Sequence, residues 1–361
     1  MKWVYLSFLV FVSIGCSKKI IQVPQDKEVN SGSTSTVGEI SLNSATASKT
    51  TTQTQSVSVV FTKNSFGKLT LSTLSGEIET ASSSDLRDLG NEVRIAMSDM
   101  NLDGIADYVL ASGPGVNPRI KVLSGTDYSV LSNFSVPISN QNGGLFISVC
   151  DANEDGRKEI IVGADRGGLP TVLMLDGTGN VLSSFLAYAP EFYGGVRVAC
   201  GDVRGDGRDE IITGAGRDGG PHIRVFDGVG TVLSEFMAFD SAYRGGVFVT
   251  TGNVLGDGKR EIIVGNGGNS LPEVRIYDAV TMQLVRSFAP YPASFTGGVR
   301  VATRQIRGDV QINGDLTAEI LTMPGPGLPP TVSIFDSSFT KILETAVNSQ
   351  DYSVGGYLAG Y

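Results

Sequence analysis

The chain has 361 residues, of which 46 are glycine and only 18% are charged, and its formal net charge is −9 with a pI near 4.8. The acidic balance argues against nucleic acid as a partner, because phosphate backbones are bound by clustered lysine and arginine. One histidine and three cysteines leave little room for imidazole or thiol chemistry, and the sequence contains no Cys/His metal cluster.

The first residues are typical of an export signal. Lys2 supplies a positive charge, and the apolar run Trp3–Ile14 has 12 residues, fewer than the about 20 that a membrane-spanning helix needs. The run ends in "SIGC", which resembles the bacterial lipobox. We therefore expect residues 1–15 to be a lipoprotein signal peptide and Cys16 to carry acyl chains such as palmitate. The alternative is an ordinary signal peptide with a chance cysteine.

Residues 16–55 are polar and rich in serine and threonine. They lack the apolar side chains that a folded core requires, so we expect a flexible tether between the lipid anchor and the rest of the chain.

The remainder of the chain is repetitive. The segments "NGGLFISVCDANEDGRKEIIVGA" (142–164), "YGGVRVACGDVRGDGRDEIITGA" (193–215) and "RGGVFVTTGNVLGDGKREIIVGN" (244–266) align without gaps at a spacing of 51 residues. Looser copies precede and follow them, and the last carries an insertion. A period near 50 residues is typical of propellers and solenoids. One aspartate marks each unit: Asp103, Asp155, Asp206, Asp257 and Asp315.

Each unit contains four short apolar segments between Gly/Asp turns. In the third unit these are residues 195–200, 210–214, 222–227 and 232–239. Alternating patterns and β-branched residues predict strands, and no helical periodicity of useful length is present. Four strands per repeat predict an all-β fold, a β-propeller made of four-stranded blades.

The two ends of the repeat region predict how the ring closes. Residues 57–81 match only the second half of a unit, and residues 352–361 match only its first strand. A blade completed by strands from both termini would fasten the ring. We therefore expect a propeller over residues 56–361 with six blades, and five or seven are the alternatives.

The loop between the first and second strand of a unit, here called the A–B loop, carries oxygen ligands in the first two units. The sequences are "DMNLDGIAD" and "DANEDGRKE". Oxygens at loop positions 1, 3, 5 and 9, with glycine at position 6, suit Ca²⁺. An EF-hand is excluded because position 12 is Leu110 or Val162. The side-chain ligands expected are Asp99, Asn101, Asp103 and Asp107 in the first loop, and Asp151, Asn153, Asp155 and Glu159 in the second.

A strand, the pattern D-x-[DN]-x-D-G-x-x-[DE] and another strand, repeated in blades, resemble the FG-GAP repeats of the integrin α-subunit propeller and its bacterial relatives. The resemblance covers about residues 57–361. It implies Ca²⁺ in each competent A–B loop, held mainly for rigidity. It also implies that the backbone carbonyls of Ile105 and Arg157 join the ligands.

The later A–B loops depart from this pattern. The third has Asp202, Asp206 and Glu210, but Arg204 replaces the ligand at position 3. In the fourth loop the four ligand positions hold Asn253, Leu255, Asp257 and Glu261, and in the fifth they hold Gln311, Asn313, Asp315 and Glu319. We expect Ca²⁺ at two loops, with the third as an additional candidate. Plain hairpin turns, in which Asp and Gly serve backbone geometry, are the alternative.

Two further features invite a functional interpretation that the repeat does not support. The tripeptide RGD occurs at residues 204–206 and 307–309. Asp206 aligns with the ligand aspartates, so we expect it to point into its loop and expect no adhesive role for the tripeptide.

Cys150 and Cys200 lie in neighbouring units, but Cys200 aligns with Val149. We therefore expect two small buried side chains rather than a disulfide.

Together these features predict a non-enzymatic binding, adhesion or scaffold module on the bacterial cell envelope, presenting propeller loops to an unidentified protein or glycan. We expect a monomer that contacts the membrane only through its lipid. Ser17 is not the aspartate that retains lipoproteins at the inner membrane in some bacteria, which favours the outer membrane. The alternative is an enzyme on the same scaffold, a lyase or hydrolase acting on polysaccharide.

Overall fold

The computed structural model describes residues 59–63, 68–72, 78–80, 86–90, 92–139, 142–304, 317–346 and 357–358. The chain divides into two compact units, Met1–Gln53 and Thr54–Tyr361, and all described residues belong to the second. The predicted signal peptide, the lipidation site Cys16 and the whole predicted tether lie outside the described residues. Within the described ranges, no helix has the length and apolar character needed to cross a membrane.

Five four-stranded antiparallel blades follow one another along the chain, each with its strands paired in sequence order. A short 3-10 helix, η1 (Arg87–Leu89), precedes them. The blades are β4 (Val93–Ser98), β5 (Asp107–Ser112), β6 (Arg119–Leu123) and β7 (Val130–Ser135); β8 (Leu145–Cys150), β9 (Glu159–Ala164), β10 (Thr171–Leu175) and β11 (Val181–Leu186); β12 (Val196–Gly201), β13 (Glu210–Ala215), β14 (His222–Phe226) and β15 (Val232–Met237); β16 (Val247–Gly252), β17 (Glu261–Asn266), β18 (Val274–Tyr277) and β19 (Leu284–Phe288); and β20 (Val299–Arg304), β21 (Glu319–Pro324), β22 (Thr331–Phe335) and β23 (Lys341–Ala346).

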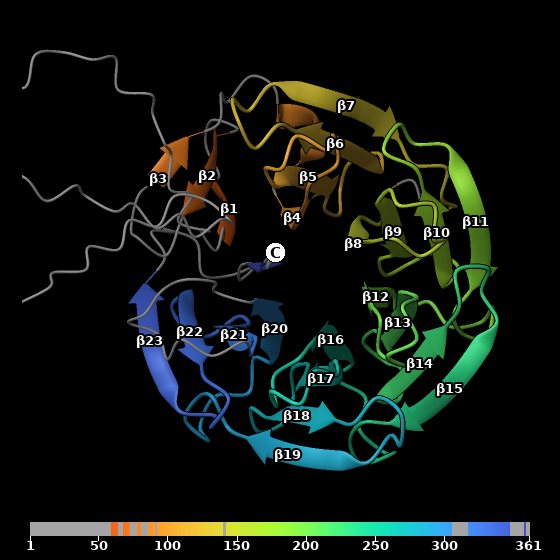
Figure 1. The fold of residues 1–361 in the computed structure, drawn as a ribbon. Helices are drawn as coiled ribbons and strands as arrows, with labels where there is room; N and C mark the ends of the chain where they lie inside the picture. The colour runs from red at the N-terminus through yellow and green to blue at the C-terminus, as the bar shows by residue number, and fades with distance from the viewer. Residues whose placement is uncertain are drawn as a thin grey trace, which may run out of the picture. The chain divides into compact units, whose positions relative to one another are not determined.

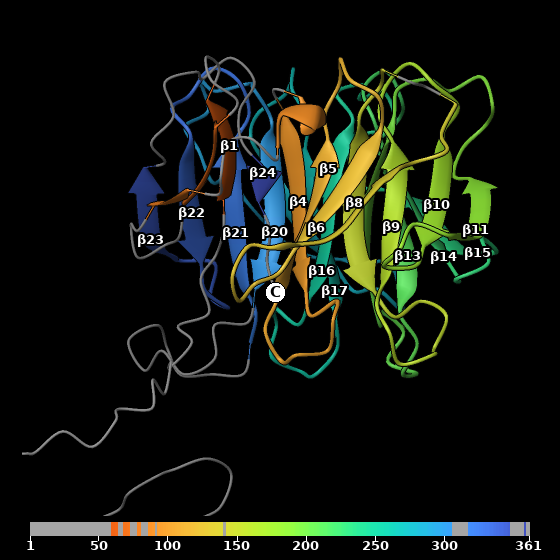
Figure 2. The ribbon, with the colours of Figure 1, turned by 90° about the horizontal axis from the view of Figure 1, so that it is seen from above.

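The blades are arranged around a common centre (Figure 1), with β4, β8, β12, β16 and β20 innermost and β7, β11, β15, β19 and β23 at the rim. The innermost strands of successive blades lie side by side. Seen at 90°, the loops that join β4 to β5 and β8 to β9 extend from the same end of the blades (Figure 2). The prediction of an all-β propeller with four-stranded blades is confirmed.

The described blades number five, not the predicted six. Four further strands, β1 (Val59–Lys63), β2 (Lys68–Ser72), β3 (Ile78–Thr80) and β24 (Tyr357–Leu358), form a sheet of order β24-β1-β2-β3. This order combines strands from both ends of the chain, as the half-units predicted. The half-units supply only short strands, two of them three residues or fewer, so closure of the ring through this sheet stays a prediction.

The core lies between the blades. In each of the five blades, the second strand is buried at all six positions. In the outermost strands β7, β11, β15 and β23, the residues after the first alternate between exposed and half-buried. Val109 and Ile120 of the first blade share a buried cluster with Ile160 and Leu173 of the second. Gly163 shows how closely the blades approach, because a Cβ there would overlap the Val196 carbonyl oxygen of the next blade.

Candidate metal centre

Each A–B loop in the described part of the chain is closed by a buried carboxylate at position 9, the first residue of the second strand. Glu159 Oε2 accepts the backbone N–H groups of Ala152 at 2.9 Å and Asn153 at 3.4 Å. Glu210 binds Val203 N–H in the same way, at 3.1 Å. Burial raises the pKa of Glu159 and of Glu210 to about 7. The ionised form of these groups is therefore poorly compensated by the protein alone.

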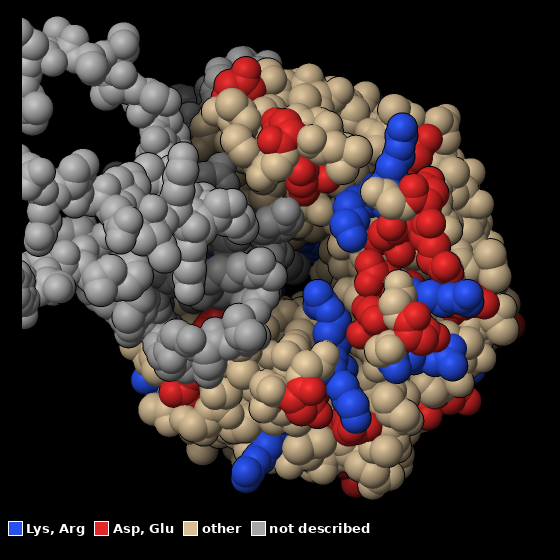
Figure 3. All heavy atoms as spheres, viewed as in Figure 1, with Lys and Arg blue, Asp and Glu red and all other residues tan. Residues whose placement is uncertain are grey.

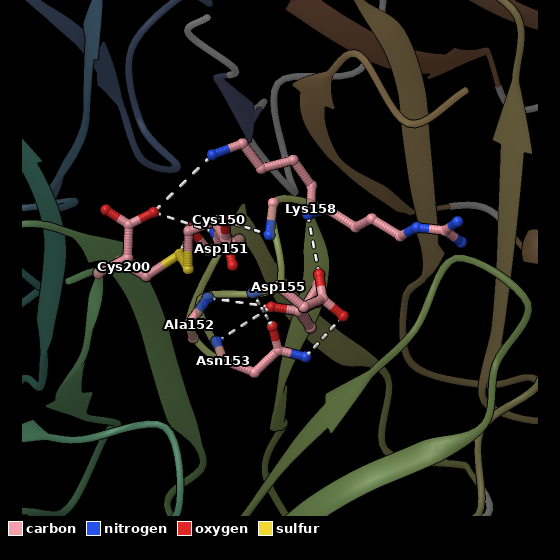
Figure 4. Close-up of polar contacts among 12 residues, drawn as sticks. Cys150, Asp151, Ala152, Asn153, Asp155, Lys158 and Cys200 are labelled. Carbon is pink, nitrogen blue, oxygen red and sulfur yellow. Dashed lines mark hydrogen bonds and ion pairs between the residues drawn. A yellow bond between two sulfur atoms is a disulfide. The ribbon is translucent and has the colours of Figure 1, made fainter. Parts of the chain in front are cut away.

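The second A–B loop brings three carboxylates together. One oxygen each from Asp151, Asp155 and Glu159 lies within 4.8 Å of the others. Figure 4 shows Asp151, Asn153 and Asp155 of this loop. Asn153 Oδ1 accepts the Asp155 N–H at 2.9 Å, and Asn153 Nδ2 donates to Asp155 Oδ2 at 3.2 Å. Asp151 Oδ1 is buried without a hydrogen-bond partner. A buried carboxylate oxygen of this kind is costly unless a cation or donor reaches it.

Two residues of this loop adopt left-handed backbone conformations. Gly156 at position 6 has φ +82°, as its sequence position predicted, and Glu154 at position 4 has φ +65°. The turn brings the Gly156 N–H to Asp151 Oδ2 at 3.0 Å. Position 4 is glycine in the third loop, Gly205, with φ +71°. This second left-handed position was not predicted from the sequence, although glycine occupies it in two later units.

The first A–B loop has the predicted residues but a different arrangement. Asp107 accepts the Gly125 N–H through Oδ1 at 2.9 Å and the Met100 N–H through Oδ2 at 2.9 Å, so both oxygens already have donors. Asp99 accepts the N–H groups of Asp103 at 3.1 Å and Gly104 at 2.8 Å. The Asp107 side chain is one methylene shorter than that of Glu159, which occupies the same position in the second loop. Asn101 Nδ2 donates to Asp103 Oδ2, and the Ile105 N–H donates to Asp103 Oδ1.

The third A–B loop binds its own backbone. Asp202 accepts the N–H groups of Gly205 at 2.7 Å and Gly207 at 2.9 Å on separate oxygens. Arg204 Nη1 lies 3.9 Å from Asp206 Oδ2. The Arg204 and Asp206 side chains are half exposed, but their charged groups face each other instead of pointing outward to a partner. Asp206 binds within its loop, as expected, through the Arg208 N–H at 3.2 Å.

The fourth loop keeps the turn geometry but lacks a full ligand set. Asn253 Oδ1 accepts the Gly256 N–H at 2.9 Å, and Leu255 occupies position 3. In the fifth loop, residues Gln311, Asn313 and Asp315 lie outside the described residues, and so does the second RGD. Among the residues that the structure describes, the second loop alone forms a cluster of three carboxylates suited to a metal.

Cys150 and Cys200 form a disulfide between the second and third blades, with a Cα–Cα distance of 6.1 Å (Figure 4). The prediction of two separate side chains was therefore wrong. Cys150 pairs with Glu159 across its blade, whereas Cys200 pairs with Ile211, one residue off that register. In a strand, an offset of one residue turns the side chain to the opposite face. Neighbouring blades present opposite faces to each other, so the offset is what allows the two sulfurs to meet.

Polar contacts join the same two loops. Asp209 Oδ2 accepts the Asp151 N–H at 3.0 Å, Arg208 Nε lies 3.1 Å from Glu154 Oε1, and Lys158 Nζ lies 3.9 Å from Asp209 Oδ2. Acidic and basic side chains crowd over the second and third blades on the face seen in Figure 3. Asp209 was not predicted as part of this site, because its partner lies 58 residues away in another unit.

No protein-family model matches the chain, and no curated protein matches it. Among solved structures, it is similar to the exotype rhamnogalacturonan lyase YesX (15% identity, TM-score 0.42, 80% of this chain and 61% of that one). It is also similar to the Dos1 propeller (14%, 0.41, 82% and 86%) and to a Bacillus licheniformis rhamnogalacturonan lyase (15%, 0.40, 82% and 62%). The chain spans about three fifths of the length of these lyases. At such identities the likeness concerns the fold alone.

Proposed function

We propose that the chain is a non-enzymatic binding module whose propeller is stabilised by Ca²⁺ in the second A–B loop and presents its loops to a protein or glycan. Two observations carry the proposal: Asp151, Asp155 and Glu159 converge, and one Asp151 oxygen is buried without a hydrogen-bond partner. All three side chains come from one loop closed by its own backbone. This arrangement suits an ion that makes a loop rigid.

The donor set fits calcium. It consists of hard oxygen atoms, the ligand type that Ca²⁺ prefers over transition metals. The FG-GAP resemblance adds Asn153 and the Arg157 carbonyl to the three carboxylates. When bound, the ion would supply positive charge at the point where these carboxylates meet. The first and third loops are weaker candidates, because Asp107 and Asp202 already use both oxygens to accept backbone N–H groups.

We also propose that the sheet β24-β1-β2-β3 is a sixth blade that closes the ring in a monomer. β24 pairs with β1 and lies beside β4 and β20, the innermost strands of the first and fifth described blades. A closed ring leaves only short, protected strand edges, which supports this arrangement.

For location we propose the bacterial envelope, with the chain anchored through lipid on Cys16. The Cys150–Cys200 disulfide supports export, because disulfides persist mainly in oxidising compartments.

The test is a binding screen of the purified Cys16→Ser chain on a glycan array and on envelope extracts, with Ca²⁺ and with EDTA. The proposal expects saturable binding that weakens in EDTA, with no change in the bound glycan. Release of shortened polysaccharide products would contradict it and favour the enzyme alternative.

A further inference from the structure

Besides the 3.9 Å ion pair of Lys158 with Asp209, three contacts fasten the junction between the second and third A–B loops, here called the loop 2–loop 3 seam. The disulfide joins Cys150, the residue before Asp151, to Cys200 of the next blade. Asp209 Oδ2 accepts the N–H of Asp151 itself at 3.0 Å. An ion pair of 3.1 Å joins Arg208 to Glu154. Two of the three fasten the backbone at Asp151, the first ligand of the proposed calcium loop.

The other described seams have no equivalent. Asp209 occupies position 8 of its loop, where the other loops have Ala106, Lys158, Arg260 and Ala318. The Arg260 side chain packs against Gly201, and the Ala318 N–H donates to the Asn253 carbonyl. At these two seams, position 8 therefore reaches the start of the preceding loop. Only in the third loop does it supply a carboxylate there.

These contacts fix the position of Asp151 but leave one of its carboxylate oxygens, Oδ1, without a hydrogen bond. Asp151 Oδ2 is held by the Gly156 N–H, and the Asp151 N–H is held by Asp209. Asp151 Oδ1 is then left buried without a hydrogen-bond partner. Because the backbone of Asp151 is already fixed, its carboxylate loses little conformational entropy when it binds a cation.

We propose that Asp209 and the Cys150–Cys200 disulfide are positioning elements for calcium, so that the second loop reaches its full affinity only when clamped by the third blade. The inference rests on the proposed calcium loop. Residues that orient metal ligands without touching the metal typically change affinity by roughly 10- to 100-fold when removed. The third loop would thus serve the neighbouring site although its own ligand set is impaired by Arg204.

The experiment is calorimetric titration of Ca²⁺ into the full chain and its variants. Asp209→Ala should weaken binding at one site by roughly 10-fold or more. Asp209→Asn should recover much of that loss, because the amide oxygen can still accept the Asp151 N–H. The double variant Cys150→Ser/Cys200→Ser should weaken the same site. Asp218→Ala is the matched control, since Asp218 pairs with Arg166 across the same two blades at 3.1 Å, beyond the far end of β13.

The possible failures are distinguishable. If Asp155→Ala binds as many calcium ions as the wild-type chain, the second loop is not a calcium site, and this inference is overturned with it. Wild-type binding with an unchanged Kd in Asp209→Ala overturns the inference alone. A lower melting temperature in calcium-free buffer with an unchanged Kd assigns Asp209 a structural role and also overturns it. If the double serine variant does not fold, Asp209→Ala and Asp209→Asn decide the matter.

Discussion

Glu261 Oε2 accepts the backbone N–H of Val254 at 2.9 Å in a loop whose other ligand positions include Leu255. The same bond joins Glu159 to Ala152 in the second loop. The position-9 carboxylate thus closes the turn whether or not the loop has a full ligand set. Closure of the loop therefore does not depend on a complete set of metal ligands.

Glu261 predicts a pH dependence of stability. Burial raises its pKa to about 7, above the ordinary 4.5, so the folded chain holds this proton more tightly than the unfolded chain. The stability that the protonated group contributes is fully present below pH 4.5 and is lost as the pH rises through 7. In calcium-free buffer the melting temperature should therefore fall between pH 5.5 and pH 8.

Glu261→Gln should reduce this slope, because a neutral amide can accept the Val254 N–H at either pH. Thermal melts at four or five pH values measure the effect, with the exposed Glu191→Gln as the matched control. An identical slope in Glu261→Gln and in the unmodified chain would show that Glu261 is not the titrating group.

Tyr188 joins the second blade to the third. Its hydroxyl donates to the His222 carbonyl at 3.0 Å and lies 3.0 Å from Thr213 Oγ1. Tyr188→Phe leaves the fully buried Thr213 hydroxyl without this contact, so the free energy of unfolding should fall by about 1–2 kcal/mol. Urea denaturation measures the change. Tyr193→Phe, at a side chain that is 54% exposed, should change stability by less than about 0.5 kcal/mol, and equal losses would contradict the prediction.

The proposed lipid anchor can be tested by substituting Cys16. Cys16→Ser removes the thiol that a lipid would modify, so the chain should move from the membrane fraction to the soluble fraction of expressing bacteria. Fractionation followed by immunoblotting measures this. Cys150→Ser, which leaves Cys16 intact, should remain with the membrane. Membrane retention of Cys16→Ser would show that the lipobox interpretation is wrong.

Features that lie within one repeat could be predicted from the sequence. The alternation in "HIRVF" and the aligned loop "DANEDGRKE" gave the strands and the convergence of Asp151, Asp155 and Glu159. Features that depend on how one repeat faces the next could not. The disulfide was missed because aligning Cys200 with Val149 compares equivalent positions, whereas bridging two blades requires non-equivalent ones. Asp209 was missed for the same reason.

The difference between the first two loops also escaped the sequence pattern, which accepts either Asp or Glu at position 9. Asp107 and Glu159 differ by one methylene, yet both Asp107 oxygens receive backbone N–H groups. Of these two loops, only the second has its carboxylate oxygens gathered within 4.8 Å. Side-chain reach therefore separates two loops that share one pattern.

Calcium stoichiometry tests the central claim most directly. Isothermal titration of Ca²⁺ should give about one bound ion fewer in Asp155→Ala than in the unmodified chain, because Asp155 is a proposed ligand in the second loop. Asp257→Ala, the same change in the fourth loop, should leave the number of bound ions as it was. An Asp155→Ala chain that binds as many ions as the unmodified one, with the same Kd, would contradict the calcium assignment.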